Sequence, residues 1–200
     1  MACWFVHKDS PLKTVGDVFE AAKKNSDKFN FGSIAVGTAQ NLSTLNFRVD
    51  GGIERADGVP FRTTGEVVTG LLSGNIQAAF ETIPGVIGQI QGGSLRAIAV
   101  SSNKRVPFLP DVPTIAEGGV PNYWTYSWNG MVLPAKTPPN LVTRINKEIN
   151  SAFATPEIQK RFKDLIVEPR TGTPDELQKM YETDVTMWRR IITEAKIQPN

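Results

Sequence analysis

The sequence predicts an α/β fold in which a parallel or mixed β-sheet is covered by helices. Over residues 3–100, short apolar segments of strand-like composition alternate with segments of helical periodicity. The links between them are short, which is typical of sheets whose strands are connected through helices. Beyond residue 137 every predicted element is a helix.

The chain begins with a strand and a helix. Residues 3–7 are bulky, aromatic and β-branched, so we expect a short buried strand that stops at the turn of 9–12. Thr14 and Asp17 have the spacing of a capped helix start, and the apolar stripe behind them ends near Asn25.

The second strand leads into the loop on which the functional interpretation depends. Residues 29–31 are predicted to form the strand, and the small residues of 32–41 form a loop that runs into a helix. This helix carries Leu42, Leu45 and Asn46 at helical spacing. Residues 49–52 are interpreted as the turn that ends it.

A further strand and helix follow. Residues 59–62 are predicted as a short strand, and Thr63 and Thr64 as the cap of a helix that Gly74 closes. The buried face expected for this helix consists of Val67, Val68, Leu71 and Leu72.

The alternation continues once more. Residues 76–80 are predicted as a strand, and Glu81 and Thr82 lie at its end. A helix begins at Ile83, with a proline in its first turn, where the missing N–H costs little. Residues 95–100 form the last strand of this series.

The C-terminal part is predicted to contain one long strand and then helices only. The strand is expected in the second half of the aromatic stretch 122–133, after the stiff connector 107–113. Helices are expected to begin at Pro138, Thr155 and Thr173. The positions that recur on their faces, which we expect to pack inward, are Leu141, Ile145, Ile149, Phe153, Ile158, Phe162, Leu165, Leu177, Met180, Tyr181, Asp184, Trp188, Ile191 and Ile192.

The composition excludes several classes of function. The 200 residues carry a formal charge of +2 from interspersed basic and acidic side chains, so no nucleic-acid partner is expected. Cys3 and His7 are the only cysteine and histidine, which leaves no cluster for a metal site. The chain has neither an apolar run of the roughly twenty residues that span a bilayer nor a secretory signal. Read literally this indicates the cytoplasm, but a fragment of a longer protein would look the same.

Small hydroxylated residues gather at the expected helix starts. In open α/β sheets, ligands bind at the carboxyl ends of strands, where unpaired N–H groups and the helix dipole favour an anion. Three such places recur, at 33–41, at 63–64 and at 81–82. The sequence therefore indicates an anion site built from helix starts. The alternative for the first loop is an ordinary helix cap, which uses the same residue types.

An enzyme that acts on a small acid is the competing class. Its nucleophile would be Ser33 or Cys3, with His7 or Glu81 as the base. No base is adjacent to either nucleophile in sequence and the hydrolase motifs are missing, so we predict no catalytic residue and no cofactor. For Glu81 we weigh two roles, rejection of wrong anions and acceptance of a hydrogen bond from a bridging water or an amine, against a solvated carboxylate.

A longer motif resembles a known family. Residues 93–101 (GSLRAIAVS), Arg105 and residues 109–119 (LPDVPTIAEGG) are similar to the signature of the Bug family, the extracytoplasmic solute-binding proteins of tripartite tricarboxylate transporters. The resemblance extends from about Val6 to the C-terminus. It implies a type II periplasmic-binding-protein-like fold whose two α/β lobes enclose a small carboxylate. Di- and tricarboxylates, acidic amino acids and aromatic acids are the implied ligands.

The resemblance also implies which residues bind. The family's motif of a serine, spaced glycines, a hydroxyl residue and usually a histidine is similar to 33–41, with Ala35 replacing the first glycine and Asn41 the histidine. Its Val-Pro-Tyr-Lys-Gly and Phe-Asp segments are similar to 59–63 and 80–81. These departures leave the identity of the carboxylate open. The expected ligand-binding residues are Ser33, Gly37, Thr38, Ala39, Gln40, Asn41, Thr63, Thr64, Glu81 and Thr82.

Finally, the resemblance implies a division of the chain. Residues 1–10 correspond to a crossing (hinge) strand, 11–122 to one complete three-layer lobe, and 123–200 to the return strand and C-terminal helices of an incomplete second lobe. Family members normally carry a signal peptide and a further half-lobe before the matching part, so we expect exposed apolar surface and self-association or a missing partner segment. The implied partners are membrane permease subunits and the implied location is the periplasm. A ligand-sensing module that signals to a partner protein is the alternative function.

Overall fold

The computed structural model describes residues 1–24, 28–53, 58–121 and 123–195, and the chain divides into two compact units. The first unit comprises Met1–Ser127 and Arg190–Asn200, and the second comprises Trp128–Arg189. Asn25, where the first helix is expected to end, and Asn122, the expected lobe boundary, lie outside the described residues. No helix in the described part of the chain is long and apolar enough to cross a bilayer.

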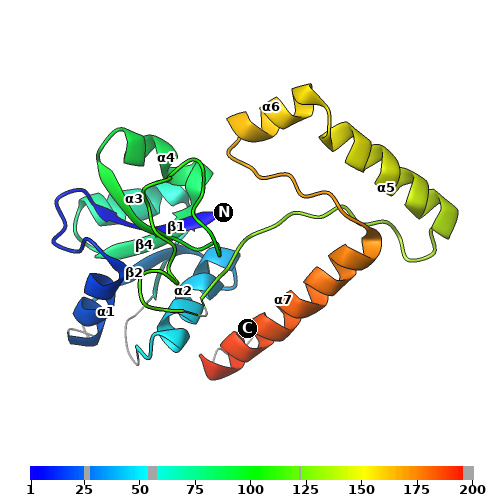
Figure 1. Cartoon of the computed structure of the whole chain (residues 1–200). Coiled ribbons are helices and arrows are strands. Elements are labelled where there is room, and N and C mark those ends of the chain that lie inside the picture. The colour runs from blue at the N-terminus through cyan, green and yellow to red at the C-terminus, as the bar shows by residue number, and fades with distance from the viewer. Residues whose placement is uncertain (25–27, 54–57, 122, 196–200) are drawn as a thin grey trace. The chain divides into compact units, whose positions relative to one another are not determined.

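The first unit is built on a five-stranded sheet with the strand order β3-β2-β4-β1-β5 (Figure 1). The strands are β1 (Ala2–His7), β2 (Phe31–Ile34), β3 (Gly58–Phe61), β4 (Ala78–Thr82) and β5 (Leu95–Val100). β2 pairs in parallel with β3 and β4, whereas β1 is antiparallel to β4 and β5. The sheet is therefore mixed, and the carboxyl ends of β2, β3 and β4 lie at one edge of it.

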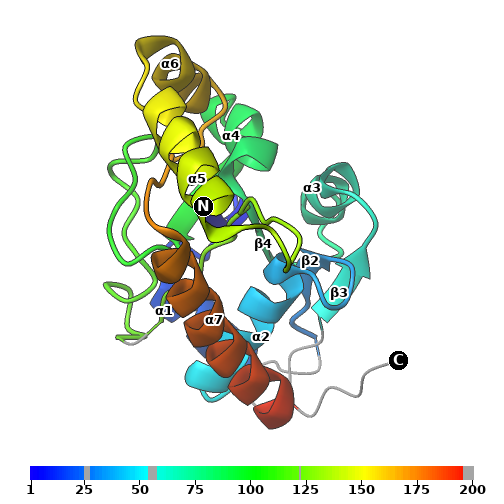
Figure 2. The same cartoon turned by 90° about the vertical axis from the view of Figure 1, so that its right-hand side faces the viewer.

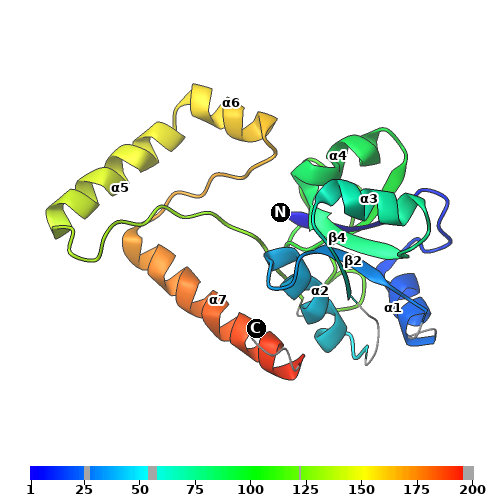
Figure 3. The ribbon, with the colours of Figure 1, turned by 180° about the vertical axis from the view of Figure 1, so that it is seen from behind.

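Helices cover both faces of this sheet. α1 (Val15–Lys24) and α2 (Ala39–Asp50) lie on one face, and α3 (Thr64–Leu72) and α4 (Ile83–Gln91) lie on the other (Figures 1 and 3). Right-handed crossovers place α2 and α3 on opposite faces because the connections from β2 to β3 and from β3 to β4 run in opposite directions across the sheet. The predicted α/β fold is thus confirmed.

Trp4 lies at the centre of the core between the sheet and helices α1 and α2. Its ring centroid is 5.0 Å from that of Phe31, 4.7 Å from that of Phe47 and 5.4 Å from that of Phe80. Phe47 also stacks on Phe19 of α1, with ring centroids 4.5 Å apart. Aromatic packing therefore joins β1, β2 and β4 to both helices of this face.

Side-chain caps fix several helix starts as the sequence predicts. Thr14 Oγ1 accepts a hydrogen bond from the N–H of Asp17 at 3.1 Å, and Asp17 Oδ2 accepts one from the N–H of Thr14 at 2.9 Å. The hydroxyls of Thr63 and Thr173 likewise accept from the amide three residues further on. Each of these bonds satisfies a backbone donor that the helix cannot.

The boundaries of β2 differ from the predicted ones. The strand begins at Phe31 instead of ending there, so Gly32 and Ser33 belong to the strand and not to the loop. The parallel ladder with β3, which pairs Phe31 with Gly58 and continues to Ile34, extends the strand in this direction. Phe29 is buried in front of the strand and therefore has the same apolar signature as a strand residue.

Two smaller boundaries and the burial of one residue also differ. α2 continues through Asp50, so the turn that ends it begins at Gly51, its C-cap. β4 begins at Ala78 and not at Ile76. Leu72 was expected on the buried face of α3 but is 47% exposed, because it is the last residue of the helix, where the chain already turns into the cap at Ser73.

The long strand predicted in the second half of 122–133 is not formed. Residues 123–134 have no regular secondary structure. An extended segment becomes a strand only through a ladder of hydrogen bonds with a neighbour. Thr125 donates its N–H to Ser101 O at 2.8 Å, but beyond this point Met131 and Val132 are 66% and 82% exposed. The apolar composition that suggested a buried strand is therefore displayed on the surface.

The second unit is helical. It contains α5 (Pro139–Phe153), α6 (Pro156–Asp164) and the part of α7 (Pro174–Glu194) that precedes Arg190 (Figures 1 and 2). Trp128 Nε1 donates a hydrogen bond to Asp184 Oδ2 in α7 at 2.6 Å. Polar contacts of this kind contribute to the order of a unit that has little apolar core.

The apolar faces of α5 and α6 are only partly buried: Phe153 and Phe162 pack on each other with ring centroids 4.9 Å apart, but the prediction of inward packing is wrong for Leu141 and Leu165. Neither helix contains a buried residue, and Leu141 and Leu165 are both exposed. The described part of the second unit supplies no sheet against which these faces could pack. Ile191 of α7, which belongs to the first unit, is fully buried. The exposed apolar surface that the sequence also led us to expect is present at Leu141 of α5 and at Leu165, the C-cap of α6.

Candidate ligand-binding site

Helices α2, α3 and α4 start at the same edge of the sheet, because each follows one of the strands β2, β3 and β4, whose carboxyl ends lie there. Their N-cap residues are Thr38, Thr63 and Thr82. The positive ends of these helix dipoles therefore belong to one edge of the first unit.

Glu81 connects these helix starts. It lies on β4 and its exposed fraction is 1%. Oε1 of its carboxylate accepts hydrogen bonds from Gln40 Nε2 of α2 at 2.8 Å and from the N–H of Thr82 at 2.6 Å. Oε2 accepts one from the hydroxyl of Thr64, the first residue of α3, at 3.0 Å. The three helix starts thus meet around one carboxylate, and the solvated carboxylate considered for Glu81 is excluded.

The first turns of these helices present backbone amides that precede the first intrahelical hydrogen bonds. They include the N–H groups of Gln40, Thr64, Gly65 and Gly85. Gly65 and Gly85 are exposed. Such amides are the groups that hold an anion at the start of a helix.

The loop before α2 is held by its own hydrogen bonds. Ser33 is buried, and its Oγ accepts from Asn41 Nδ2 at 3.4 Å. Thr38 Oγ1 accepts from the N–H of Asn41 at 3.3 Å and donates to Ala35 O at 2.8 Å. Gly37 has a φ of 84°, in the left-handed region that favours glycine, and its N–H donates to Asn41 Oδ1 at 3.2 Å. These residues shape the loop and the first turn of α2.

The ten predicted residues therefore fall into two groups. The structure brings four of them together around the buried carboxylate: Gln40, Thr64, Thr82 and Glu81 itself. The others form or cap the loop and the helix starts: Ser33, Gly37, Thr38, Ala39, Asn41 and Thr63. The second group corresponds to the ordinary helix cap that was the alternative interpretation of the loop.

Sequence reasoning missed Gly85 in the first turn of α4. A Cβ atom built on Gly85 would lie 3.3 Å from Thr64 Cγ2 and 3.3 Å from Thr82 Oγ1. A side chain at this position would therefore crowd the space between the starts of α3 and α4. The signal in the sequence is a glycine directly after Pro84, since glycine is otherwise unfavourable inside a helix.

The residues considered for catalysis are not arranged for it. Cys3 is fully buried, and burial together with the nearby charge of Glu81 raises the pKa of its thiol to about 12. A reactive cysteine needs the opposite shift. His7 lies at the other end of β1, where it pairs with Leu95, whereas Cys3 pairs with Glu81. In the described part of the chain no group of three or more His, Cys, Asp or Glu side chains could hold a metal ion.

A hollow of about 710 Å³ lies at the opposite edge of the sheet. Its lining includes Phe29, Ile76 and Gln77, which precede β2 and β4, and His7 at the end of β1. None of the ten predicted residues lines it. Because ligands of such sheets bind at the carboxyl ends of the parallel strands, this hollow is not the expected position.

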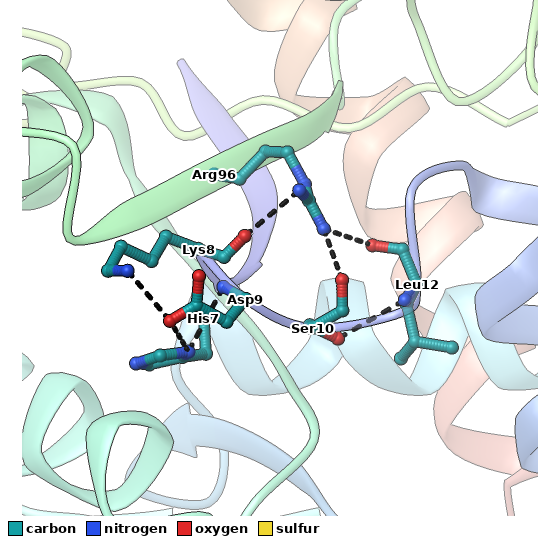
Figure 4. A network of polar contacts seen from close by, with 6 residues as sticks. All are labelled: His7, Lys8, Asp9, Ser10, Leu12 and Arg96. Carbon is teal, nitrogen blue, oxygen red and sulfur yellow. Dashed lines mark hydrogen bonds and ion pairs between the residues drawn. The ribbon is translucent and has the colours of Figure 1, made fainter.

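Arg96 fixes the turn beside this hollow (Figure 4). Its guanidinium donates to the carbonyl oxygens of Lys8 at 2.9 Å, Ser10 at 2.5 Å and Leu12 at 3.1 Å. Asp9 accepts a hydrogen bond from Lys8 Nζ at 2.7 Å, and this bond holds the pKa of its carboxyl below the usual value. Nη1 and Nη2 of the guanidinium thus both donate to backbone carbonyls, which gives Arg96 a structural role in ordering the turn that follows β1.

Comparison with known proteins identifies similar sequences. A family model described as "Tripartite tricarboxylate transporter family receptor" matches residues 2–197. A UPF0065 protein encoded in the tcbD–tcbE intergenic region of Pseudomonas sp. (strain P51) is 30% identical over 196 residues, which are 98% of this chain and 58% of that protein. Protein BugT of Bordetella pertussis is 27% identical over 184 residues, which are 92% of this chain and 56% of BugT. The chain thus spans a little over half the length of these relatives.

Solved structures show the same fold. The structure of R. palustris Rpa4515 with adipate has a TM-score of 0.85 and 28% identity, and the match covers 100% of this chain and 66% of that one. The periplasmic binding protein BugD has a TM-score of 0.80 and 28% identity, with 100% of this chain and 67% of BugD covered. These likenesses confirm the predicted fold class, a periplasmic-binding-protein-like α/β fold with one lobe and part of a second.

Proposed function

Because the chain belongs to the tripartite tricarboxylate transporter receptor family, we propose that it acts as the ligand-binding part of an extracytoplasmic receptor that captures a small carboxylate. The family consists of solute-binding proteins and not of enzymes. The observation that carries the proposal is the meeting of three helix starts around Glu81, next to the first-turn amides of α2, α3 and α4.

Capture of an acid by this site needs no reactive side chain. The amides of Gln40, Thr64, Gly65 and Gly85 would donate to carboxylate oxygens, and each such bond to a charged group contributes about 1.5–3 kcal/mol. The hydroxyl of Thr82 makes no cap bond and is a further donor. Partial positive charges at the helix starts then balance the ligand without a full counter-charge.

The class of ligand is proposed from the family and from one neighbour. Rpa4515 was solved with adipate, a dicarboxylate. We include di- and tricarboxylates, acidic amino acids and aromatic acids, because each presents a carboxylate to the amides described above. In the proposed cycle, closure of two lobes over the ligand presents the receptor to membrane permease subunits in the periplasm.

Binding by the unmodified chain tests this proposal. Titration calorimetry with a panel of di- and tricarboxylates that includes adipate is expected to give saturable binding. Gly85→Val, which crowds Thr64 and Thr82, should weaken it at least about tenfold, the effect of losing one charge-assisted hydrogen bond. Gly88→Val on the same helix is the matched control, because a Cβ there meets nothing within 4 Å. Absence of binding by the unmodified chain, or equal binding by both variants, would contradict the proposal.

Self-association is proposed for the same chain. No residue of α5 or α6 is fully buried and Leu141 and Leu165 are exposed, and apolar surface of this kind on a protein in water favours a partner. We expect sedimentation velocity to show a mass that rises with concentration above the 21.9 kDa of one chain. Replacing Leu141 and Leu165, both exposed, with glutamate should restore a single 21.9 kDa species. A chain that stays monomeric at every concentration would refute this expectation.

A further inference from the structure

Glu81 is a buried carboxylate whose hydrogen-bond donors are all neutral groups. Its two oxygens accept hydrogen bonds from an amide side chain, a hydroxyl and a backbone N–H. All three partners can donate, which suits the acceptor-only pattern of an ionised carboxylate. A buried charge without a counter-ion is costly unless hydrogen bonds and dipoles compensate for it.

The compensation comes from the place where a ligand anion is expected. The three donors belong to Gln40 in the first turn of α2, Thr64 at the first position of α3 and Thr82 at the N-cap of α4. The positive ends of these three helix dipoles therefore already stabilise one negative charge of the protein, the Glu81 carboxylate. Any acid bound by the neighbouring amides adds a second negative charge close to the first.

We propose that Glu81 determines the charge class of the ligand, so that the site favours acids with few or widely separated negative charges over compact trianions. This inference rests on the proposed function of the same site. Glu81 acts on the ligand through its charge and through the helix starts that it holds, without a requirement for direct contact. It is therefore a positioning and selecting residue.

The distance between the Glu81 carboxylate and a ligand carboxylate sets how strongly Glu81 changes the affinity. A carboxylate held by first-turn amides lies within about one helical turn, roughly 5–8 Å, of a carboxylate bonded to the same turns. At an effective dielectric constant of about 20, one additional unit charge at that distance changes affinity by at least about tenfold. Adipate can place its second carboxylate several methylene groups away, whereas the three carboxylates of citrate stay close together.

Glu81→Gln isolates the charge because the shape of the side chain is retained. The amide oxygen of the introduced glutamine can occupy the position of Oε1 and accept from Gln40 and Thr82, while its NH₂ group donates to the Thr64 hydroxyl, which accepts as readily as it donates. The matched control is Thr64→Val, which removes one hydrogen bond to Glu81 and leaves its charge in place. The two variants therefore separate loss of charge from loss of a contact.

The test measures the affinities of adipate and citrate by calorimetry at pH 7.5 and low salt for the unmodified chain and both variants. Glu81→Gln should raise the ratio of citrate affinity to adipate affinity at least about tenfold. Thr64→Val should weaken both acids and leave the ratio unchanged. A purely structural role for Glu81 would change both affinities together and would not move the ratio.

The outcomes distinguish this inference from the proposed function. If the unmodified chain binds adipate and Glu81→Gln leaves the ratio unchanged, the selecting role is overturned and the receptor function stands. If the unmodified chain binds neither acid but Glu81→Gln binds citrate, the selecting role stands and the receptor function of the unmodified chain fails. If no variant binds either acid, both are overturned.

Discussion

Replacing Trp4 with alanine is expected to lower the free energy of unfolding of the first unit by about 3–5 kcal/mol. Trp4 is 1% exposed, and its ring packs against Phe31, Phe47 and Phe80. Alanine would leave a cavity bounded by β2, β4 and α2, whose backbones the sheet and helices hold in place. A loss of this size is comparable to the total stability of many domains, so much of the variant would be unfolded at room temperature.

Urea denaturation followed by far-ultraviolet circular dichroism measures this loss. Trp4→Phe is the informative companion, because the buried Trp4 Nε1 has no hydrogen-bond partner and phenylalanine removes this unsatisfied donor. We expect it to cost less than about 1.5 kcal/mol, as conservative apolar exchanges do. Trp124→Ala is the position control, since Trp124 is only partly buried and stacks on Tyr126 alone among aromatic rings of the described residues. Equal losses for Trp4→Ala and Trp124→Ala would show that Trp4 is not central to the core.

The strand–helix alternation of the first unit could be predicted because its signals are local. Thr14 with Asp17, and Thr63 with the amide of Glu66, are contacts within one helical turn, so the residue types reveal them. The boundaries of β2 could not be read in the same way. Phe29 is buried in the core although it belongs to no strand. A buried residue is apolar whether or not it lies in a strand, so the sequence does not distinguish the two cases.

The periodicity of apolar residues also failed to predict which face of α2 is buried. Leu42 and Leu45 suggested the buried side, but both are only partly buried. The residues that the helix buries are mostly polar: Asn41, Ser43, Thr44, Asn46 and Phe47. The backbone carbonyl of Ser43 accepts a hydrogen bond from the hydroxyl of Tyr123, which is 80 residues away, and no sequence pattern displays such a partner. A pattern of apolar residues cannot reveal a face whose burial depends on distant donors.

The sequence could predict which helix starts contribute to the candidate site. It could not predict which of their residues contact one another. Gln40 and Thr64 are 41 and 17 residues from Glu81, and only the sheet order brings them to one carboxylate. The sequence placed Glu81 at the end of a strand, where solvent exposure was as reasonable as burial. Sheet order is set by pairing between strands, which a single sequence leaves open.

Replacing Gln40 with glutamate is expected to destabilise the first unit by about 3–5 kcal/mol at pH 7, the cost of an uncompensated buried charge. Gln40 Nε2 donates to Glu81 Oε1 at 2.8 Å. Glutamate would replace this donor with a second carboxylate at the same distance from Glu81, whose other hydrogen-bond donors are the neutral groups of Thr64 and Thr82. Two carboxylates this close cannot both be ionised without a large penalty, so the folded pair would retain one shared proton.

Because the folded Gln40→Glu variant retains this proton, its loss of folding stability should increase as pH rises. Near neutral pH the unfolded chain releases the proton that the folded pair of Gln40→Glu keeps, so the folded state binds more protons and its stability falls as pH rises. Unfolding curves of Gln40→Glu measured between pH 5 and pH 8 should therefore show stability recovering toward pH 5, relative to the unmodified chain. Gln40→Met is the matched control: it loses the same hydrogen bond without adding a charge, so its cost should be about 1–2 kcal/mol at every pH. If the Gln40→Glu loss is as small as that of Gln40→Met and equally independent of pH, then water reaches the Glu81 carboxylate freely. In that case Glu81 could not impose its charge on a bound ligand, because solvent would screen the repulsion on which ligand selection depends.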